Sequence, residues 1–82
     1  MRKDTILYRV LKYIYLNRDR EVTSRDISNA VGIPTSQVHK FIVRLIHVKK
    51  RRDGRIVKFY LPKYEHERVK KFLEIEDDES IE

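Results

Sequence analysis

The sequence predicts an α+β fold that is mainly helical, with a three-helix core, one β-hairpin and an additional C-terminal helix. Three observations predict it. Residues 5–17 carry apolar side chains at helical spacing. Two further helical segments, 24–31 and 35–48, are separated by a short linker that contains glycine and proline. An Asp-Gly pair then lies between two segments with strand character, which is a strong hairpin signal.

The first helix is predicted over residues 5–17, where Asp4 or Thr5 can serve as the cap. Its apolar positions recur at spacings of three and four: Ile6, Leu7, Val10, Leu11 and Ile14. Three more residues widen this apolar arc: Tyr8, Tyr15 and Leu16. The arc is wider than a small core needs, so we expect this helix to cover a second surface.

A short second helix should follow a brief strand at Val22. Thr23 and Asp26 have the spacing of a capping box, in which each side chain bonds the other residue's backbone N–H. The residues expected to be buried are Ile27, Ala30 and Val31. Gly32 should end the helix, because glycine accepts the left-handed conformation found there.

A third helix is predicted after Pro34, with Thr35 or Ser36 as the cap and an end near Val48. Its inward residues are expected to be Val38, Phe41, Ile42 and Leu45. The outward set is then Ser36, Gln37, His39, Lys40, Val43, Arg44 and His47. This outward face is polar and basic.

Residues 49–60 read KKRRDGRIVKFY and are predicted to form the hairpin, with Asp53 and Gly54 as a two-residue turn. That turn would place Arg52 opposite Arg55, Arg51 opposite Ile56, Lys50 opposite Val57, Lys49 opposite Lys58, and Val48 opposite Phe59. Two of these pairs bring like charges together, which costs stability. A polyanion lying along the hairpin would reverse that cost. The alternative is that lysines merely protect a sheet edge.

A last helix is predicted from Tyr64 to about Ile75. Its apolar face consists of Val69, Phe72 and Leu73. We expect a single domain over residues 1–75, followed by an acidic tail at 76–82 that is disordered.

The charge is distributed unevenly along the chain. The formal net charge is +6, from 19 Lys and Arg and 13 Asp and Glu. Residues 72–82 hold six of the acids and no Lys or Arg, so residues 1–71 carry a net charge of +12. A body this basic attracts polyanions, and nucleic acid is the partner that this charge favours. A charged, solubilising surface is the alternative reading.

At residues 24–44 and the following hairpin, the sequence resembles the winged helix-turn-helix family of DNA-binding domains. The residues that carry the pattern are Ile27, Ser28, Val31, Gly32, Ile33, Val38 and Phe41. Ser28 stands where the family most often has Ala, and it is still small enough for the two helices to cross closely. The resemblance spans residues 5–62. The Cys-free, Lys- and Ile-rich composition is similar to that of small transcriptional regulators of archaea and their viruses.

The resemblance implies binding to double-stranded DNA, with the third helix in the major groove and the basic hairpin, or wing, on the backbone or minor groove. Gln37 and Arg44 are candidate base readers, because Gln can bridge adenine and Arg can bridge guanine. Val43 could touch a thymine methyl group. The predicted DNA-binding residues are Thr35, Ser36, Gln37, His39, Lys40, Val43, Arg44, Lys49, Lys50, Arg51, Arg52, Arg55 and Lys58.

Purely structural roles remain open for several of these residues. Thr35 and Ser36 can be simple caps, Gln37 can be solvated, and Val43 can pack on a neighbour. The hairpin basic residues can be edge protection alone.

Other classes of function find little support in the sequence. The chain has no Cys and only two glycines, which leaves no thiol nucleophile and no glycine-rich phosphate loop. Its three histidines lack a metal-binding spacing, so we expect no enzyme activity, no metal and no cofactor. No apolar run approaches the ~18 residues of a membrane span. We expect a cytoplasmic protein, or one in the host cytoplasm if it is viral.

The function expected is therefore that of a transcriptional regulator, a homodimer formed through the first and last helices. One alternative is a winged-helix protein-interaction module in a transcription or replication complex. Another is non-specific architectural or single-stranded binding, in which Phe59 or Tyr60 would stack on bases.

Overall fold

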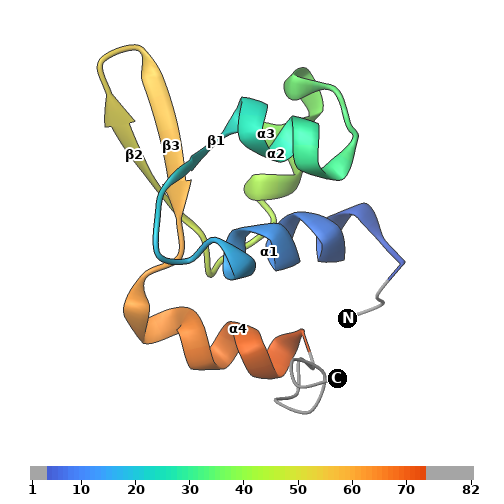
Figure 1. The fold of residues 1–82 in the computed structure, drawn as a ribbon, viewed down its shortest axis with the longest axis vertical. Coiled ribbons are helices and arrows are strands. Elements are labelled where there is room, and N and C mark those ends of the chain that lie inside the picture. The colour runs from blue at the N-terminus through green and yellow to red at the C-terminus, as the bar shows by residue number, and fades with distance from the viewer. Residues whose placement is uncertain (1–3, 74–82) are drawn as a thin grey trace.

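The computed structural model describes residues 4–73 and confirms the predicted architecture (Figure 1). The helices are α1 Ile6–Leu16, α2 Ser24–Val31, α3 Thr35–Ile42 and α4 His66–Phe72, the last preceded by the 3₁₀ turn η1 Lys63–Glu65. The strands are β1 Val22–Thr23, β2 Lys49–Asp53 and β3 Ile56–Tyr60. They form one antiparallel sheet in the order β1-β3-β2. The predicted acidic tail lies outside the described residues.

The sequence signals for helix boundaries hold at the first two helices. Thr5 caps α1, where its Oγ1 accepts a hydrogen bond from the Tyr8 N–H at 3.1 Å. Thr23 and Asp26 form both bonds of the predicted capping box at the start of α2. Gly32 ends α2 with a φ of 81°, in the left-handed region where a side chain would be strained.

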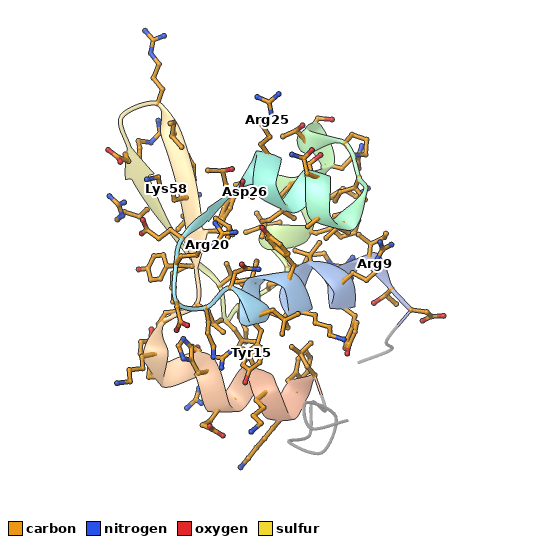
Figure 2. All side chains as sticks on the ribbon, viewed as in Figure 1. Arg9, Tyr15, Arg20, Arg25, Asp26 and Lys58 are labelled. Atoms are coloured by element: carbon orange, nitrogen blue, oxygen red, sulfur yellow. The ribbon has the colours of Figure 1, made fainter. Side chains whose placement is uncertain are left out.

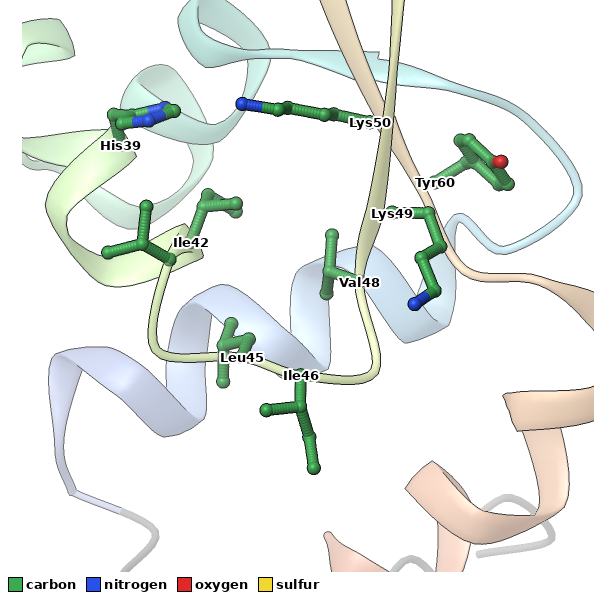
Figure 3. A pocket seen from close by; sticks show the side chains of 9 residues that line it. His39, Ile42, Leu45, Ile46, Val48, Lys49, Lys50 and Tyr60 are labelled. Atoms are coloured by element: carbon green, nitrogen blue, oxygen red, sulfur yellow. The ribbon is translucent and has the colours of Figure 1, made fainter.

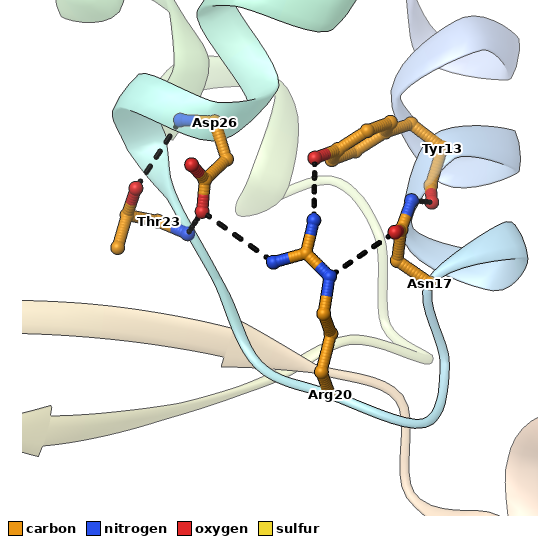
Figure 4. Close-up of polar contacts among 5 residues, drawn as sticks. All are labelled: Tyr13, Asn17, Arg20, Thr23 and Asp26. Atoms are coloured by element: carbon orange, nitrogen blue, oxygen red, sulfur yellow. Dashed lines mark hydrogen bonds and ion pairs between the residues drawn. The ribbon is translucent and has the colours of Figure 1, made fainter.

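Arg20 fixes the connection between α1 and α2 (Figure 4). Its guanidinium donates to the Asn17 Oδ1 at 3.2 Å and to the Tyr13 hydroxyl at 3.1 Å, both in the segment that ends α1. It also lies 3.9 Å from a carboxylate oxygen of Asp26, which belongs to the capping box of α2. One arginine thereby joins the end of α1 to the start of α2.

The core lies around α1, with α2 and α3 on one side and α4 on the other (Figure 1). Neither the basic strand β2 nor η1 contributes to its fully buried side chains, which are Val10, Leu11, Ile14, Val22, Ile27, Val38, Phe59, Val69 and, directly after α4, Leu73. Tyr8 and Tyr15 are also buried, at 6% and 7% exposure, and Figure 2 shows Tyr15 between α1 and α4. The tyrosines of the wide apolar arc of α1 are therefore buried within the chain, while Leu16 is left 61% exposed. A homodimer through the first helix cannot use these two tyrosines.

The third helix is shorter than predicted and has a different cap. It ends at Ile42, and residues 43–48 form tight turns in which the Leu45 N–H bonds the Ile42 carbonyl. These turns bury Leu45 while β-branched residues such as Val43 and Ile46 stand exposed, and β-branching disfavours continued helix. Pro34 is the N-cap, with no side-chain cap bond, so the prediction of a Thr35 or Ser36 cap was wrong.

Ala30 departs from its predicted burial. It is exposed on α2, because only the Ile27 and Val31 side of this short helix contacts the core.

The hairpin turn lies one residue further along the chain than predicted. Asp53 pairs with Ile56, so the two turn residues are Gly54 and Arg55. Gly54 takes the first turn position with a φ of 63°, the positive value that hairpin turns require there. The observed register pairs Arg52 with Val57, Arg51 with Lys58, Lys50 with Phe59, and Lys49 with Tyr60. The predicted pairs Arg52–Arg55 and Lys49–Lys58 are therefore absent. Repulsion within these two pairs cannot be taken as a sign that the hairpin binds DNA.

Candidate nucleic-acid interface

The outward face of α3 is fully accessible. Val38 and Ile42 hold the helix against the core, which turns its polar residues to solvent. The exposed residues on this helix are Thr35, Ser36, Gln37, His39 and Lys40. Val43 follows directly after the helix and is 63% exposed, so it does not pack on a neighbour. The first N–H groups of a helix have no partner inside it, and here no side chain caps them. They can hold an anion such as a phosphate.

The observed register divides the hairpin cations between two faces. Cross-strand partners share a face, and successive residues alternate. Lys50 and Arg52 therefore lie on the face of Phe59 and Val57, which pack toward the helical core. Lys49, Arg51 and Lys58 lie on the opposite face.

Two of the three cations on the opposite face, Arg51 and Lys58, have acidic partners. Arg51 donates two hydrogen bonds to Glu21, Nε to Oε2 at 2.7 Å and Nη2 to Oε1 at 2.6 Å. The Lys58 Nζ lies 3.5 Å from the Asp53 Oδ2. These partners offset the like charges that the register places opposite each other, Arg51 and Lys58.

The Arg51–Glu21 pair also changes the acidity of both groups. The hydrogen bonds from Arg51 lower the pKa of Glu21, and the Glu21 carboxylate raises the pKa of Arg51. Both groups are thus held in their charged forms at neutral pH.

The cations on the face toward α3 have no such partners. Within the part of the chain that the structure describes, no carboxylate forms an ion pair with Lys50, Arg52 or Arg55. Figure 3 shows Lys50 reaching from β2 toward His39 on α3. This hairpin face and the outward side of α3 therefore border the same space.

A cleft of about 450 Å³ separates α3 from β2 (Figure 3). It is lined by His39, Ile42, Val43, Leu45, Ile46, Val48, Lys49, Lys50 and Tyr60. The ring of His39 approaches that of Phe59, with 6.5 Å between their centroids. The cleft has an apolar floor and a basic margin.

Two residues predicted on the outward face of α3 lie elsewhere. Arg44 is exposed, but it belongs to the turns after α3 and borders a second hollow beside Phe72. His47 points to the α4 side, where its Nδ1 lies 3.3 Å from the buried Oε1 of Glu65. Both predictions depended on a helix that continues to residue 48.

Glu21 and Asp53 are partners of hairpin cations that the sequence patterns did not indicate. The correct register would have placed Asp53 near Lys58, both on the outer face. Glu21 precedes Val22, which pairs with Phe59, and so lies beside the end of the sheet. Neither contact follows from the incorrect register.

Two further findings concern the residues from 4 to 73. No group of three or more His, Asp or Glu side chains is arranged there to hold a metal ion. No helix among them has the length and apolar character needed to cross a membrane.

No protein-family model and no curated protein matches this chain. Several solved structures do. MepR, a transcription regulator of the Staphylococcus aureus multidrug efflux pump MepA, superposes with a TM-score of 0.73 at 20% identity, over 94% of this chain and 60% of MepR. MepR in complex with DNA gives a TM-score of 0.71 at 20% identity, over 94% of this chain and 70% of the other.

A third match is the homodimeric winged helix-turn-helix DNA-binding domain Mb0332 from Mycobacterium bovis. Its TM-score is 0.69 at 16% identity, over 95% of this chain and 72% of that domain. This chain spans about 60% of the length of the free MepR chain, so the likeness concerns that part of MepR alone. The helix order, the three-stranded sheet and these superpositions together show that the chain has the winged helix-turn-helix fold.

Proposed function

We propose that this protein is a transcriptional regulator that binds double-stranded DNA and has no enzyme activity. One observation carries the proposal: the exposed His39 of α3 and the unpaired Lys50 of β2 line the same cleft, and the unpaired Arg52 lies two residues along the same face of the hairpin. An α-helix fits the major groove, and a neighbouring basic hairpin can then follow the backbone or the minor groove. The solved structure of MepR with DNA is consistent with such a role for this fold.

On α3, Gln37 is the proposed base reader, since its amide can bridge the two hydrogen-bonding groups of adenine. Lys40 would contact a phosphate, and Val43 a thymine methyl group. The uncapped helix start at Thr35 and Ser36 would hold a second phosphate. His39, at the margin of the cleft, would lie beside the backbone.

Arg44 remains a candidate phosphate contact. Its place in the turns after α3 does not suit it to reading a base.

On the wing, Arg55 at the tip and Arg52 beside it would enter or follow the minor groove, with Lys49 and Lys50 on phosphates. Arg51 and Lys58 are held by carboxylates on the other face, so they contribute less to binding. Without Arg44, which lies in the turns after α3 and is left out of the count, five cations of α3 and the wing are free to neutralise phosphates: Lys40, Lys49, Lys50, Arg52 and Arg55. If each contacts one phosphate, log K should fall against log salt with a slope of about −4.5.

We propose that the protein is a homodimer, because one module of this size reads few base pairs and a dimer binds two half-sites. The homodimeric state of Mb0332 supports this. The large side chains that α1 and the α4 segment leave exposed are Leu16, Tyr64 and Phe72. Leu16→Glu should shift the sedimentation of the protein from dimer to monomer. A monomeric wild type would overturn the proposal.

The test of DNA binding is a salt series with mixed duplex fragments. It compares wild type, the Arg52→Ala/Arg55→Ala double variant, and Lys71→Ala as a control on the exposed side of α4. Strong salt dependence with selection of one fragment supports a regulator, and the double variant should flatten the slope by about 1.8 while the control leaves it unchanged.

The same series separates the alternatives. Strong salt dependence without selection would indicate an architectural DNA binder. No binding at low salt would overturn the proposal in favour of a protein-interaction module, which the exposed apolar residues Val43 and Ile46 would then serve.

A further inference from the structure

The turns after α3 expose an apolar surface around Ile46, which is 79% exposed. The DNA-binding proposal uses Val43 and the cleft beside β2, but it gives Ile46 no role. On one side lies the cleft beside β2, and on the other a hollow of about 270 Å³ lined by Leu7, Arg44, Leu45, Ile46, His47 and Phe72. The two hollows adjoin at Leu45 and Ile46, and together they extend from Phe72 at the end of α4 to Lys49 and Lys50 on the wing. We call the two adjoining hollows the Ile46 groove.

The margins of the Ile46 groove are basic. Arg44 lies at the α4 end, and Lys49 and Lys50 lie at the wing end. All three are exposed, and no carboxylate of residues 4–73 forms an ion pair with them. An exposed apolar groove with cationic margins fits a segment that combines acidic and apolar side chains.

The chain itself supplies such a segment directly after Leu73. Residues 74–82 read EIEDDESIE, which is six acids, two isoleucines and one serine. Phe72 lines the α4 end of the groove, so residue 74 follows within two positions of the groove wall. Nine extended residues reach about 30 Å, enough to follow the groove toward the wing.

We propose that residues 74–82 bind in the Ile46 groove of their own chain. Ile75 lies against Phe72 and Ile46, and the carboxylates that follow it contact Lys49 and Lys50. The bound segment covers one margin of the surface beside α3, so it competes with DNA. This competition rests on the proposed function, whereas the binding of the segment to the groove does not.

The binding is tested without DNA. The chain has no Cys, so Ser80→Cys provides a single site for a nitroxide spin label on the full chain. The label should broaden the amide signals of residues 43–50. It should not broaden the amide signal of Arg25, which lies on α2 on the side away from α4 (Figure 2). Ile46→Ser should abolish the broadening, while Ile56→Ser, at an exposed apolar residue of the wing outside the groove, should leave it intact. Absent or evenly spread broadening overturns the proposal.

A mixing control separates binding within a chain from binding between chains. Isotope-labelled protein without the nitroxide is mixed with unlabelled protein that carries it. No broadening in the labelled protein supports binding within one chain. Broadening there would show that the segment reaches a second copy, which overturns the proposal as stated.

The competition is tested by DNA affinity at constant salt. If the form with residues 74–82 in the Ile46 groove is favoured about tenfold over the form with the groove open, the apparent affinity for DNA falls about tenfold. Ile46→Ser, and separately the change of Asp77, Asp78 and Glu79 to their amides, should each raise affinity several-fold. Combining them should add little, because both remove the same interaction. Fully additive gains would show that the acids act by charge alone and overturn the role of the groove. No DNA binding in any variant would refute the proposed function. The broadening of amide signals by the nitroxide would still show whether residues 74–82 bind in the groove.

Discussion

Replacing Glu21 with Gln should make one more cation of the wing available to DNA. In the structure, Glu21 accepts two hydrogen bonds from Arg51, at 2.7 and 2.6 Å, on the hairpin face that points away from Lys50 and Arg52. Gln keeps the shape of the side chain but carries no charge, so the guanidinium loses its ionic partner. Arg51 then becomes free to reach a phosphate at the side of the wing.

The size of the effect follows from the number of phosphates neutralised. Each added phosphate contact steepens the slope of log K against log salt by about 0.9, so the slope should change from about −4.5 to about −5.4. Between 50 and 200 mM salt, this is an additional loss of affinity of about 3.5-fold relative to wild type. Arg51→Ala in the wild type should change the slope by much less than 0.9, because Arg51 is already paired.

Fluorescence anisotropy with a labelled duplex across that salt range measures these slopes. Asp19→Asn is the matched control, since it removes one exposed acid from the same loop, where no ion pair of Asp19 with a described residue is present. It should leave the slope near the wild-type value. An unchanged slope for Glu21→Gln, together with a slope for Arg51→Ala as flat as that for Lys50→Ala, would contradict this prediction. Arg51 would then exchange Glu21 for phosphate whenever DNA binds.

Three predictions concern stability, and urea denaturation at neutral pH checks each of them. Thr23→Ala removes half of the capping box and should lower the free energy of unfolding by about 1 kcal/mol, while the neighbouring Ser24→Ala should change it little. Gly54→Ala meets no atom within 4 Å, so its cost of about 1 kcal/mol should come from the positive φ alone, and no loss would contradict the turn. His47→Ala should cost about 1–3 kcal/mol, because it leaves the buried Glu65 with a poorer partner, and an unchanged stability would show that the contact is unimportant.

Local signals in the sequence predicted most of the fold. The capping box at Thr23 and the left-handed Gly32 each depend on a few neighbouring residues, and both are present as predicted. The end of α3 depends instead on packing. Leu45 reaches the core from the tight turns at residues 43–48, and not from a continuation of the α-helix. Helical periodicity cannot distinguish these two ways to bury the same residue.

The candidate site was predictable in composition but not in arrangement. The positions of the apolar residues on α3 correctly predict which side chains are exposed, as far as Lys40. The division of the hairpin cations depends on register, and a turn displaced by one residue exchanges the cross-strand partners. Asp-Gly at positions 53 and 54 allowed both placements, and the structure chooses Gly54 as the first turn residue. The partner of Arg51 comes from Glu21, 30 residues away, which local patterns do not reach.

In the proposed function, α3 and the inner face of the wing form a single DNA-binding surface. An NMR titration of the full chain with a short duplex, at low salt, shows whether they bind DNA together. Amide signals of Gln37 and Lys40 on α3 and of Lys50 and Arg52 on β2 should shift together, with one common dissociation constant. Shifts confined to the hairpin, or shifts centred on α4, would contradict the claim.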